Sequence, residues 1–169
     1  IWDAGLFCKL EDETDKILDR NPESLEQIVV QCCKIKARVV GRDEREFGLR
    51  AILNYGHTLG HAIEQVYGYG FWLHGQAISF GMVYAGELSC RMRCFSSDDQ
   101  LRIIALLKRL GLPVESKNSD LGGRWDRLRE AMGADKKTRN SKPYFVLAES
   151  IGSVVTGCAV DESILKSTF

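Results

Sequence analysis

The stretch that decides the fold is residues 48–67, which read GLRAILNYGHTLGHAIEQVY. Apolar residues recur there at helical spacing, which predicts one helix that begins near Gly48 and ends at the Tyr67-Gly68-Tyr69-Gly70 turn. The buried face of this predicted helix consists of Leu49, Ile52, Leu59, Ile63 and Val66. The opposite face carries polar residues that are three or four positions apart, namely Arg50, Asn54, His57, His61 and Glu64.

The composition of this polar face is unusual for a face that only meets water. Solvated helix faces favour Lys, Glu and Gln, which are good helix formers, whereas this face carries histidine, asparagine and arginine. Gly56 and Gly60 lie within the same predicted helix, where each glycine costs about 1 kcal/mol relative to alanine. We expect these glycines to mark the close approach of another backbone or of a ligand.

The histidines are grouped in one part of the sequence. The chain has three of them, at positions 57, 61 and 74. His57 and His61 are one helical turn apart, and His74 begins the next predicted helix, so a hairpin can return it beside the other two. A single histidine is more often a core or surface residue, but neighbouring imidazoles suit a divalent metal such as zinc. The sequence therefore predicts a metal site.

The His57–His61 spacing also occurs in helical zinc proteases. That motif requires a glutamate directly after the first histidine, where it serves as general base. Thr58 occupies this position, and its hydroxyl cannot replace a carboxylate in that role. The sequence therefore argues against a metalloprotease.

The rest of the chain also reads mainly as helix. Asn21 and Pro22 predict the start of a first helix, whose apolar stripe contains Leu25, Ile28, Val29, Cys32, Ile35 and Val39. Further helices are expected after His74, from Ser97 to Gly111, and over 124–132. Residues 144–147 and 153–156 are expected to form a small terminal β-hairpin. We therefore predict a mainly α fold, with residues 1–169 forming one multi-helix domain.

The composition is that of a soluble globular domain. Apolar residues make up 44% and charged residues 27% of the 169 residues, and the net charge is zero, which gives no indication of a nucleic-acid or membrane partner. The six cysteines include no CxxC pair, and we expect free thiols in a reducing, cytoplasmic setting. The start at Ile1, without methionine or a targeting signal, suggests a chain cut from something longer.

Three lysines have two possible interpretations. Lys36 lies at the edge of the apolar stripe of the first helix, where its stem can pack while the ammonium group reaches water. Alternatively, it points into a cleft and supplies positive charge for an anionic substrate. Lys136 and Lys137, which follow Asp135 in a predicted loop, could likewise supply positive charge for an anionic substrate, or they could form an ordinary solvated turn.

Six short motifs, taken in order, resemble the signature of the 3-dehydroquinate synthase family. They are KARVV at 36–40, DERE at 43–46, GLR at 48–50, LNYGHT at 53–58, GHAIE at 60–64 and HG at 74–75. The close resemblance runs from about Lys34 to Gly81, and a weaker likeness covers the rest of the chain. One such motif is moderately specific, whereas the ordered set is strongly so.

The resemblance implies a two-domain enzyme of the shikimate pathway of aromatic amino acid biosynthesis. An amino-terminal α/β domain would bind NAD, and an α-helical carboxyl-terminal domain would bind Zn²⁺ or Co²⁺. The lyase reaction would convert 3-deoxy-D-arabino-heptulosonate 7-phosphate to 3-dehydroquinate and phosphate, with NAD regenerated in each cycle. The complete enzyme would be a cytoplasmic homodimer. This chain would be the carboxyl-terminal domain, because it contains no glycine-rich dinucleotide loop.

The family's functional residues map onto this sequence one by one. His57 and His74 resemble two metal ligands. The resemblance gives His61, Lys36, Arg50 and Asn54 roles in catalysis and in binding the substrate's phosphate, carboxylate and hydroxyls. One of Lys136 and Lys137 would be a further anion-binding lysine.

The sequence also departs from the family pattern. The third metal ligand would be a glutamate in an Ala-Glu-x-x-Lys segment expected just before Ile1, and Gln76 stands where the family usually has glutamate. We therefore expect the 169-residue chain alone to be inactive and to bind zinc weakly. Two alternatives stay open: a related cyclase for a seven-carbon sugar phosphate without the carboxylate, and a non-catalytic helical interaction or dimerisation module.

Overall fold

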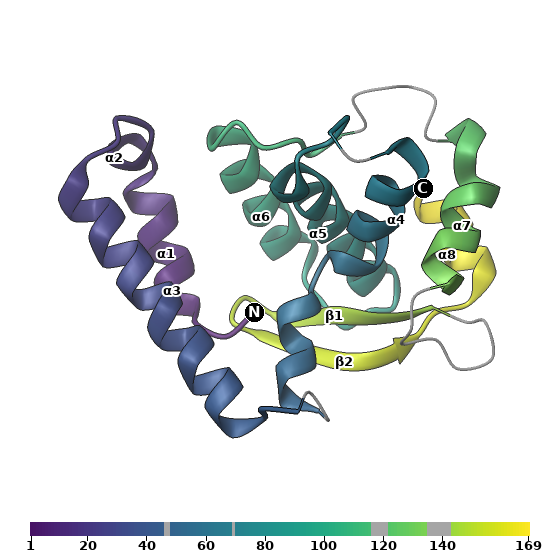
Figure 1. The fold of residues 1–169 in the computed structure, drawn as a ribbon, viewed down its shortest axis with the longest axis horizontal. Coiled ribbons are helices and arrows are strands. Elements are labelled where there is room, and N and C mark those ends of the chain that lie inside the picture. The colour runs from purple at the N-terminus through teal and green to yellow at the C-terminus, as the bar shows by residue number, and fades with distance from the viewer. Residues whose placement is uncertain (46–47, 69, 116–121, 135–142) are drawn as a thin grey trace.

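The computed structural model describes residues 1–45, 48–68, 70–115, 122–134 and 143–169, and it confirms a mainly α fold with a small sheet (Figure 1). The elements follow in the order α1 (Ala4–Asp12), α2 (Thr14–Leu18), α3 (Pro22–Arg42), the 3₁₀ helix η1 (Leu49–Asn54), α4 (His57–Tyr67), α5 (His74–Arg91), α6 (Ser97–Arg109), the 3₁₀ turn η2 (Gly122–Arg124), α7 (Trp125–Ala134), β1 (Tyr144–Ser150), β2 (Ser153–Ala159) and α8 (Glu162–Thr168). The short helices α1, α2 and α8 were not predicted. Within the described residues, no helix is long and apolar enough to span a membrane.

Helices α1, α2 and α3 form an arm at one side of the molecule (Figure 1). The predicted start of α3 is confirmed, because the Asn21 side chain accepts a hydrogen bond from the Ser24 amide at 3.0 Å and Pro22 is the first helical residue. Asp3 caps α1 in the same way and accepts a bond from Gln31 Nε2 at 2.8 Å, which ties α1 to α3. The predicted apolar stripe of α3 is only partly covered, since Val29 is 58% exposed.

The stretch predicted as one helix from Gly48 is two elements, η1 and α4, and this corrects the sequence-based expectation. The break lies at Gly56, whose φ of 81° is left-handed and does not fit an α-helix. A Cβ at Gly56 would lie 2.7 Å from the Met82 amide nitrogen of α5. At Gly60 it would lie 3.2 Å from the Ala77 carbonyl oxygen. The glycines therefore mark a close backbone approach, as expected, and α4 and α5 pack almost directly against each other.

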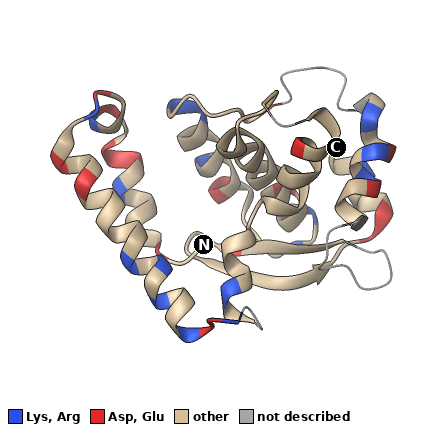
Figure 2. Cartoon of the chain, in the orientation of Figure 1, with Lys and Arg blue, Asp and Glu red and all other residues tan. Residues whose placement is uncertain are grey.

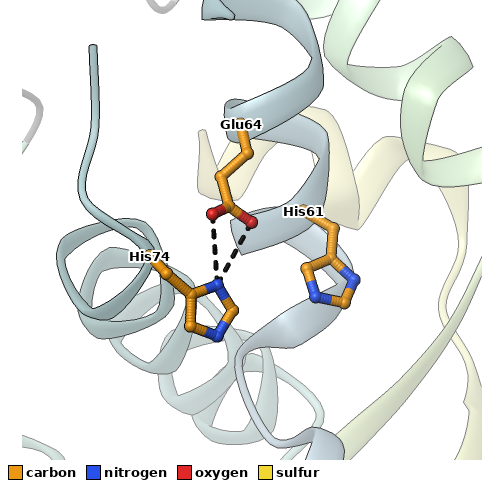
Figure 3. Close-up of side chains that lie close together, drawn as sticks. All are labelled: His61, Glu64 and His74. Atoms are coloured by element: carbon orange, nitrogen blue, oxygen red, sulfur yellow. Dashed lines mark hydrogen bonds and ion pairs between the residues drawn. The ribbon is translucent and has the colours of Figure 1, made fainter. Parts of the chain in front are cut away.

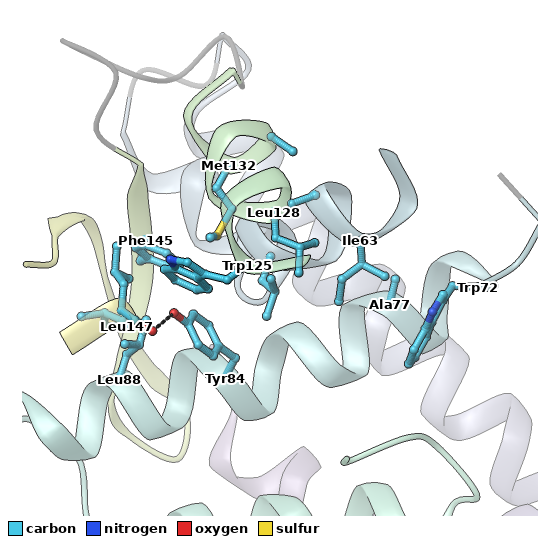
Figure 4. Packing of buried hydrophobic residues seen from close by; sticks show 14 residues of the cluster. Ile63, Trp72, Ala77, Tyr84, Leu88, Trp125, Leu128, Met132, Phe145 and Leu147 are labelled. Carbon is cyan, nitrogen blue, oxygen red and sulfur yellow. Dashed lines mark hydrogen bonds between the residues drawn. The ribbon is translucent and has the colours of Figure 1, made fainter. Parts of the chain in front are cut away.

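The main core lies between α4, α5, α7 and the hairpin. Side chains from all four meet there (Figure 4), and its fully buried members include Leu59, Ile63, Leu88, Leu128, Met132 and Leu147. Burying each side chain of this kind contributes about 1.5–3 kcal/mol. The Tyr84 hydroxyl of α5 donates to the Leu165 carbonyl of α8 at 2.7 Å. This core fixes the position of α4 relative to α5, and hence of the histidines that the two helices carry.

The carboxyl-terminal hairpin is confirmed and is longer than predicted. Strands β1 and β2 pair antiparallel, with Tyr144 opposite Ala159 and Ser150 opposite Ser153. The Thr58 hydroxyl of α4 donates to the Tyr144 carbonyl at 3.1 Å, and the Ser89 hydroxyl of α5 accepts from the Ala148 amide at 2.9 Å. The hairpin therefore joins both helices of the histidine-bearing pair.

Candidate functional site

The histidines at positions 57, 61 and 74 come together where α4 meets the start of α5. Their ring centroids are 5.2 Å apart for His57 and His61, 5.7 Å for His57 and His74, and 6.0 Å for His61 and His74. The prediction that the chain returns His74 beside the other two is confirmed. His57 is the first residue of α4 and His74 the first of α5, so two helix amino-termini converge on this cluster.

The His57 ring is oriented by the backbone just before it. Its Nδ1 lies 3.2 Å from the Tyr55 carbonyl oxygen. A carbonyl can only accept a hydrogen bond, so Nδ1 carries the proton and Nε2 of the neutral ring carries the lone pair. Tyr55 is itself buried, and its hydroxyl donates to the Met82 carbonyl at 3.2 Å. The Tyr55 carbonyl therefore favours the tautomer of His57 in which Nε2 would coordinate a metal.

The His74 ring is held by a carboxylate. Its Nδ1 lies 3.1 Å from Oε1 and 3.3 Å from Oε2 of Glu64, whose side chain reaches from α4 toward the start of α5 (Figure 3). The ligand atoms of His61, Glu64 and His74 all lie within 4.8 Å of one another. The sequence placed Glu64 on the polar face but assigned it no role, because the predicted turn after Tyr67 indicates that the chain reverses and not which side chains then meet.

The first turn of α5 is fixed by two neighbouring residues. Gln76 Oε1 accepts a hydrogen bond from the Leu73 amide at 3.3 Å, and Trp72 is buried at 4% exposure. Gln76 stands where the family usually has glutamate. Glutamine keeps the side-chain oxygen that makes this cap, so the substitution preserves the local geometry around His74.

A cleft of about 560 Å³ lies between the arm and η1, and of the histidine cluster His57 lines it, whereas His74 does not. The predicted substrate-binding residues Lys36, Arg50 and Asn54 line it together with His57, although they come from α3, η1 and α4. Ile1, Trp2 and Asp3 line it too. His61, which was predicted to face the substrate, is not among the described residues that form this lining.

Among the described residues, the charged side chains of the cleft lining are two cationic ones, Lys36 and Arg50, and one acidic one, Asp3. Lys and Arg residues are concentrated in the second half of α3 and at the start of η1, while acidic residues lie toward α2 and between α3 and η1 (Figure 2). Asp43 accepts bonds from the backbone amides of Gly48 and Arg50 at 2.8 and 2.9 Å, which fixes the start of η1. The Arg50 guanidinium donates to the Glu44 carbonyl at 3.0 Å. Lys136 and Lys137 lie outside the described residues.

Six cysteines are present, and all are free thiols, as predicted. Cys32 lines the cleft, and burial of its thiol, the largest effect, raises its pKa above the ordinary value. A thiol with a raised pKa is a poor nucleophile at neutral pH. Cys32 is therefore not a candidate nucleophile, and His57, Lys36 and Arg50 are the candidate functional side chains of the cleft.

Comparison with known proteins identifies the family. The family model described as 3-dehydroquinate synthase C-terminal matches residues 1–138. Two relatives are proteins named 3-dehydroquinate synthase. The one from Pelobacter propionicus is 45% identical over 163 residues, which covers 96% of this chain and 44% of the relative. The one from Desulforamulus reducens is 47% identical over 154 residues, which covers 91% of this chain and 42% of the relative.

Solved structures share the fold. The 2-epi-5-epi-valiolone synthase from Streptomyces hygroscopicus subsp. jinggangensis, with NAD⁺ and Zn²⁺ bound, matches with a TM-score of 0.84 at 20% identity over 99% of this chain and 46% of that one. A 2-deoxy-scyllo-inosose synthase complexed with carbaglucose-6-phosphate, NAD⁺ and Co²⁺ matches with a TM-score of 0.71 at 27% identity, over 87% of this chain and 41% of that one. The chain spans less than half the length of these proteins. Because the family model covers most of its residues, the chain belongs to the 3-dehydroquinate synthase C-terminal family.

Proposed function

We propose that this chain is the metal- and substrate-binding half of a 3-dehydroquinate synthase. The complete protein would convert 3-deoxy-D-arabino-heptulosonate 7-phosphate to 3-dehydroquinate and phosphate. The observation that carries the proposal is the position of His57, which contributes both to the histidine cluster and to the lining of the cleft that contains Lys36, Arg50 and Asn54. The relatives named above have this activity in their names.

The donor set fits a zinc or cobalt ion. His57 and His74 each place Nδ1 against an acceptor of the chain, so Nε2 would be the coordinating atom of each ring. A third ligand would come from a glutamate that precedes Ile1 in the complete protein, and Ile1 lines the same cleft as His57. When bound, the ion would polarise the substrate hydroxyl that NAD oxidises. NAD would be held by a separate domain of the complete protein.

The cationic side chains of the cleft would orient the substrate. Arg50 can bind a carboxylate or phosphate through two parallel hydrogen bonds, Lys36 acts as a more mobile point charge, and Asn54 can bond a hydroxyl. We assign His61 to the phosphate group of the substrate, as the family resemblance implies. His61 is not among the described residues that line the cleft, so it would contact the phosphate from outside this lining. Holding the reacting carbon in one orientation accelerates the reaction by itself, and the departing phosphate is a suitable proton acceptor.

The test is phosphate release by the complete protein, supplied with Zn²⁺, NAD⁺ and the heptulosonate phosphate. We expect turnover by the wild type, and we expect His57→Ala and His74→Ala to lose both bound zinc and activity. Leu101→Ala on α6, an exposed residue outside the cleft lining, serves as the matched control and should keep both. A wild-type protein that binds zinc but releases no phosphate would contradict the assignment.

A related sugar-phosphate cyclase is the second candidate, favoured by the likeness to the 2-deoxy-scyllo-inosose synthase structure. The two functions differ in whether the substrate carries a carboxylate. Turnover of the heptulosonate phosphate, with none of a sugar phosphate that lacks the carboxylate, such as glucose 6-phosphate, supports the synthase. The reverse preference would establish the cyclase.

A further inference from the structure

The four ring nitrogens of His57 and His74 are not equivalent. Nδ1 of His57 is engaged by the Tyr55 carbonyl, and Nδ1 of His74 by the Glu64 carboxylate. In each ring the acceptor lies at Nδ1, so Nε2 is the nitrogen that would coordinate a metal. Among the described residues, none offers a hydrogen-bond acceptor to the ring of His61. An acceptor of the chain therefore orients the rings of His57 and His74, the two expected metal ligands, and no such contact orients the neighbouring ring of His61 among the described residues.

The side chain of Glu64 is more deeply buried than that of His74, its hydrogen-bond partner. Its side chain is 12% exposed, whereas the His74 side chain is 59% exposed. Glu64 follows Ile63, which is completely buried in the core, on a helix that Gly60 allows to pack tightly on α5. An exposed imidazole at the first residue of a helix can otherwise rotate about its side-chain bonds. The contact with Glu64 removes this freedom from His74.

We propose that Glu64 is a positioning residue of the metal centre, which holds Nδ1–H of His74 so that Nε2 points toward the ion shared with His57. This inference rests on the proposed function only in assuming that the cluster binds a metal. Both carboxylate oxygens lie near the same ring N–H, which is the arrangement of a carboxylate that acts through a histidine. The negative charge also increases the basicity of Nε2 as a ligand.

The geometry of the rings agrees with one shared ion. Two imidazoles that each bind a tetrahedral zinc through Nε2 at about 2.0–2.1 Å have ring centres about 5 Å apart. The His57 and His74 centroids are 5.7 Å apart.

Substitutions at Glu64 distinguish positioning from direct ligation. In Glu64→Gln the side-chain oxygen still accepts from His74 Nδ1–H but carries no charge, whereas Glu64→Ala leaves no acceptor. A positioning role therefore predicts a graded loss of zinc affinity, about tenfold for Gln and about a hundredfold for Ala. Direct ligation would make the two variants equally poor, because neither keeps the carboxylate oxygen.

The experiment measures Zn²⁺ dissociation constants by chelator competition on the complete protein, and the visible spectrum of its Co²⁺ form, both without substrate or NAD. We expect the graded loss, with the Co²⁺ band of Glu64→Gln unchanged in position and intensity. Gln65→Ala, an exposed neighbour on α4, should match the wild type. Thermal unfolding without metal should show that all variants fold alike.

Three results would overturn the proposal. Equal losses with an altered Co²⁺ band would make Glu64 a ligand, and unchanged affinities in both variants would leave it without a role. A wild type that binds no metal would contradict both this inference and the proposed function. Graded zinc binding in a protein that releases no phosphate would instead preserve the positioning role and reject the synthase assignment alone.

Discussion

At the scale of single residues, the site depends on how each ring is oriented. The His57–His61–His74 cluster was predictable, because one turn of helix separates the first two and the third begins the next helix. The acceptors of His57 and His74 were not predictable: the Tyr55 carbonyl faces the ring only because the chain breaks at Gly56, and Glu64 meets His74 only through the turn before α5. Spacing indicates which residues share a face, but it does not specify contacts made across a turn.

Asp3 offers a prediction about pH. Its carboxylate accepts from the Leu6 amide, the main cause, and from Gln31, and these bonds lower its pKa below the ordinary value of an aspartate. Because the folded pKa is lower than the unfolded one, this stabilisation is present above pH about 4 and is lost as the pH falls through the folded pKa. Asp3→Ala should lower the free energy of unfolding of the 169-residue chain by about 1 kcal/mol at neutral pH.

The matched variant is Asp3→Asn, which keeps a capping oxygen but does not titrate. It should unfold with a smaller loss at neutral pH and without the acid dependence that this group contributes. Urea unfolding at neutral and acidic pH measures both effects. A difference between wild type and Asp3→Asn that does not shrink on acidification would show that the carboxylate charge is not responsible.

At the scale of elements, the break between η1 and α4 is the main difference between expectation and structure. Apolar spacing continues across residues 48–67 and predicts one helix, but it contains no information about the α5 backbone that occupies the space beside Gly56. Helices α3 and α6, which have side-chain caps from Asn21 and Ser96, and the 18-residue helix α5 were predicted well. The short helices α1, α2 and α8 were missed because their lengths of nine, five and seven residues give a weak periodic signal.

Gly56→Ala tests this break. The methyl group would meet the Met82 amide nitrogen at 2.7 Å, in a left-handed backbone conformation that disfavours alanine. We expect a loss of about 3 kcal/mol in the free energy of unfolding and weaker zinc binding, because His57 is the next residue. Gly41→Ala is the control: no atom lies within 4 Å of the new methyl group in α3, so it should gain about 1 kcal/mol in helix propensity. Urea unfolding compares the two, and similar effects at both sites would contradict the close-packing argument.

At the scale of the whole molecule, the cleft lies between the arm and η1. The chain covers less than half the length of its named relatives. We predict that the 169-residue chain does not turn over the heptulosonate phosphate with Zn²⁺ and NAD⁺, because hydride transfer requires a bound nicotinamide that this domain alone would not hold. Zinc should also bind the chain more weakly than the complete protein. Phosphate release measures turnover, and chelator competition measures zinc affinity, in the 169-residue chain and in the complete protein. Turnover by the 169-residue chain would refute the prediction.

The two helices that begin at His57 and His74 have a consequence for the order in which the site fills. Each helix amino-terminus carries a partial positive charge of about half a unit, so a metal ion enters a region that already repels cations and attracts anions. An anion at the same place offsets that repulsion. We therefore expect inorganic phosphate to strengthen zinc binding, and thermodynamic linkage then requires zinc to strengthen phosphate binding by the same factor. The site would bind the two ions cooperatively.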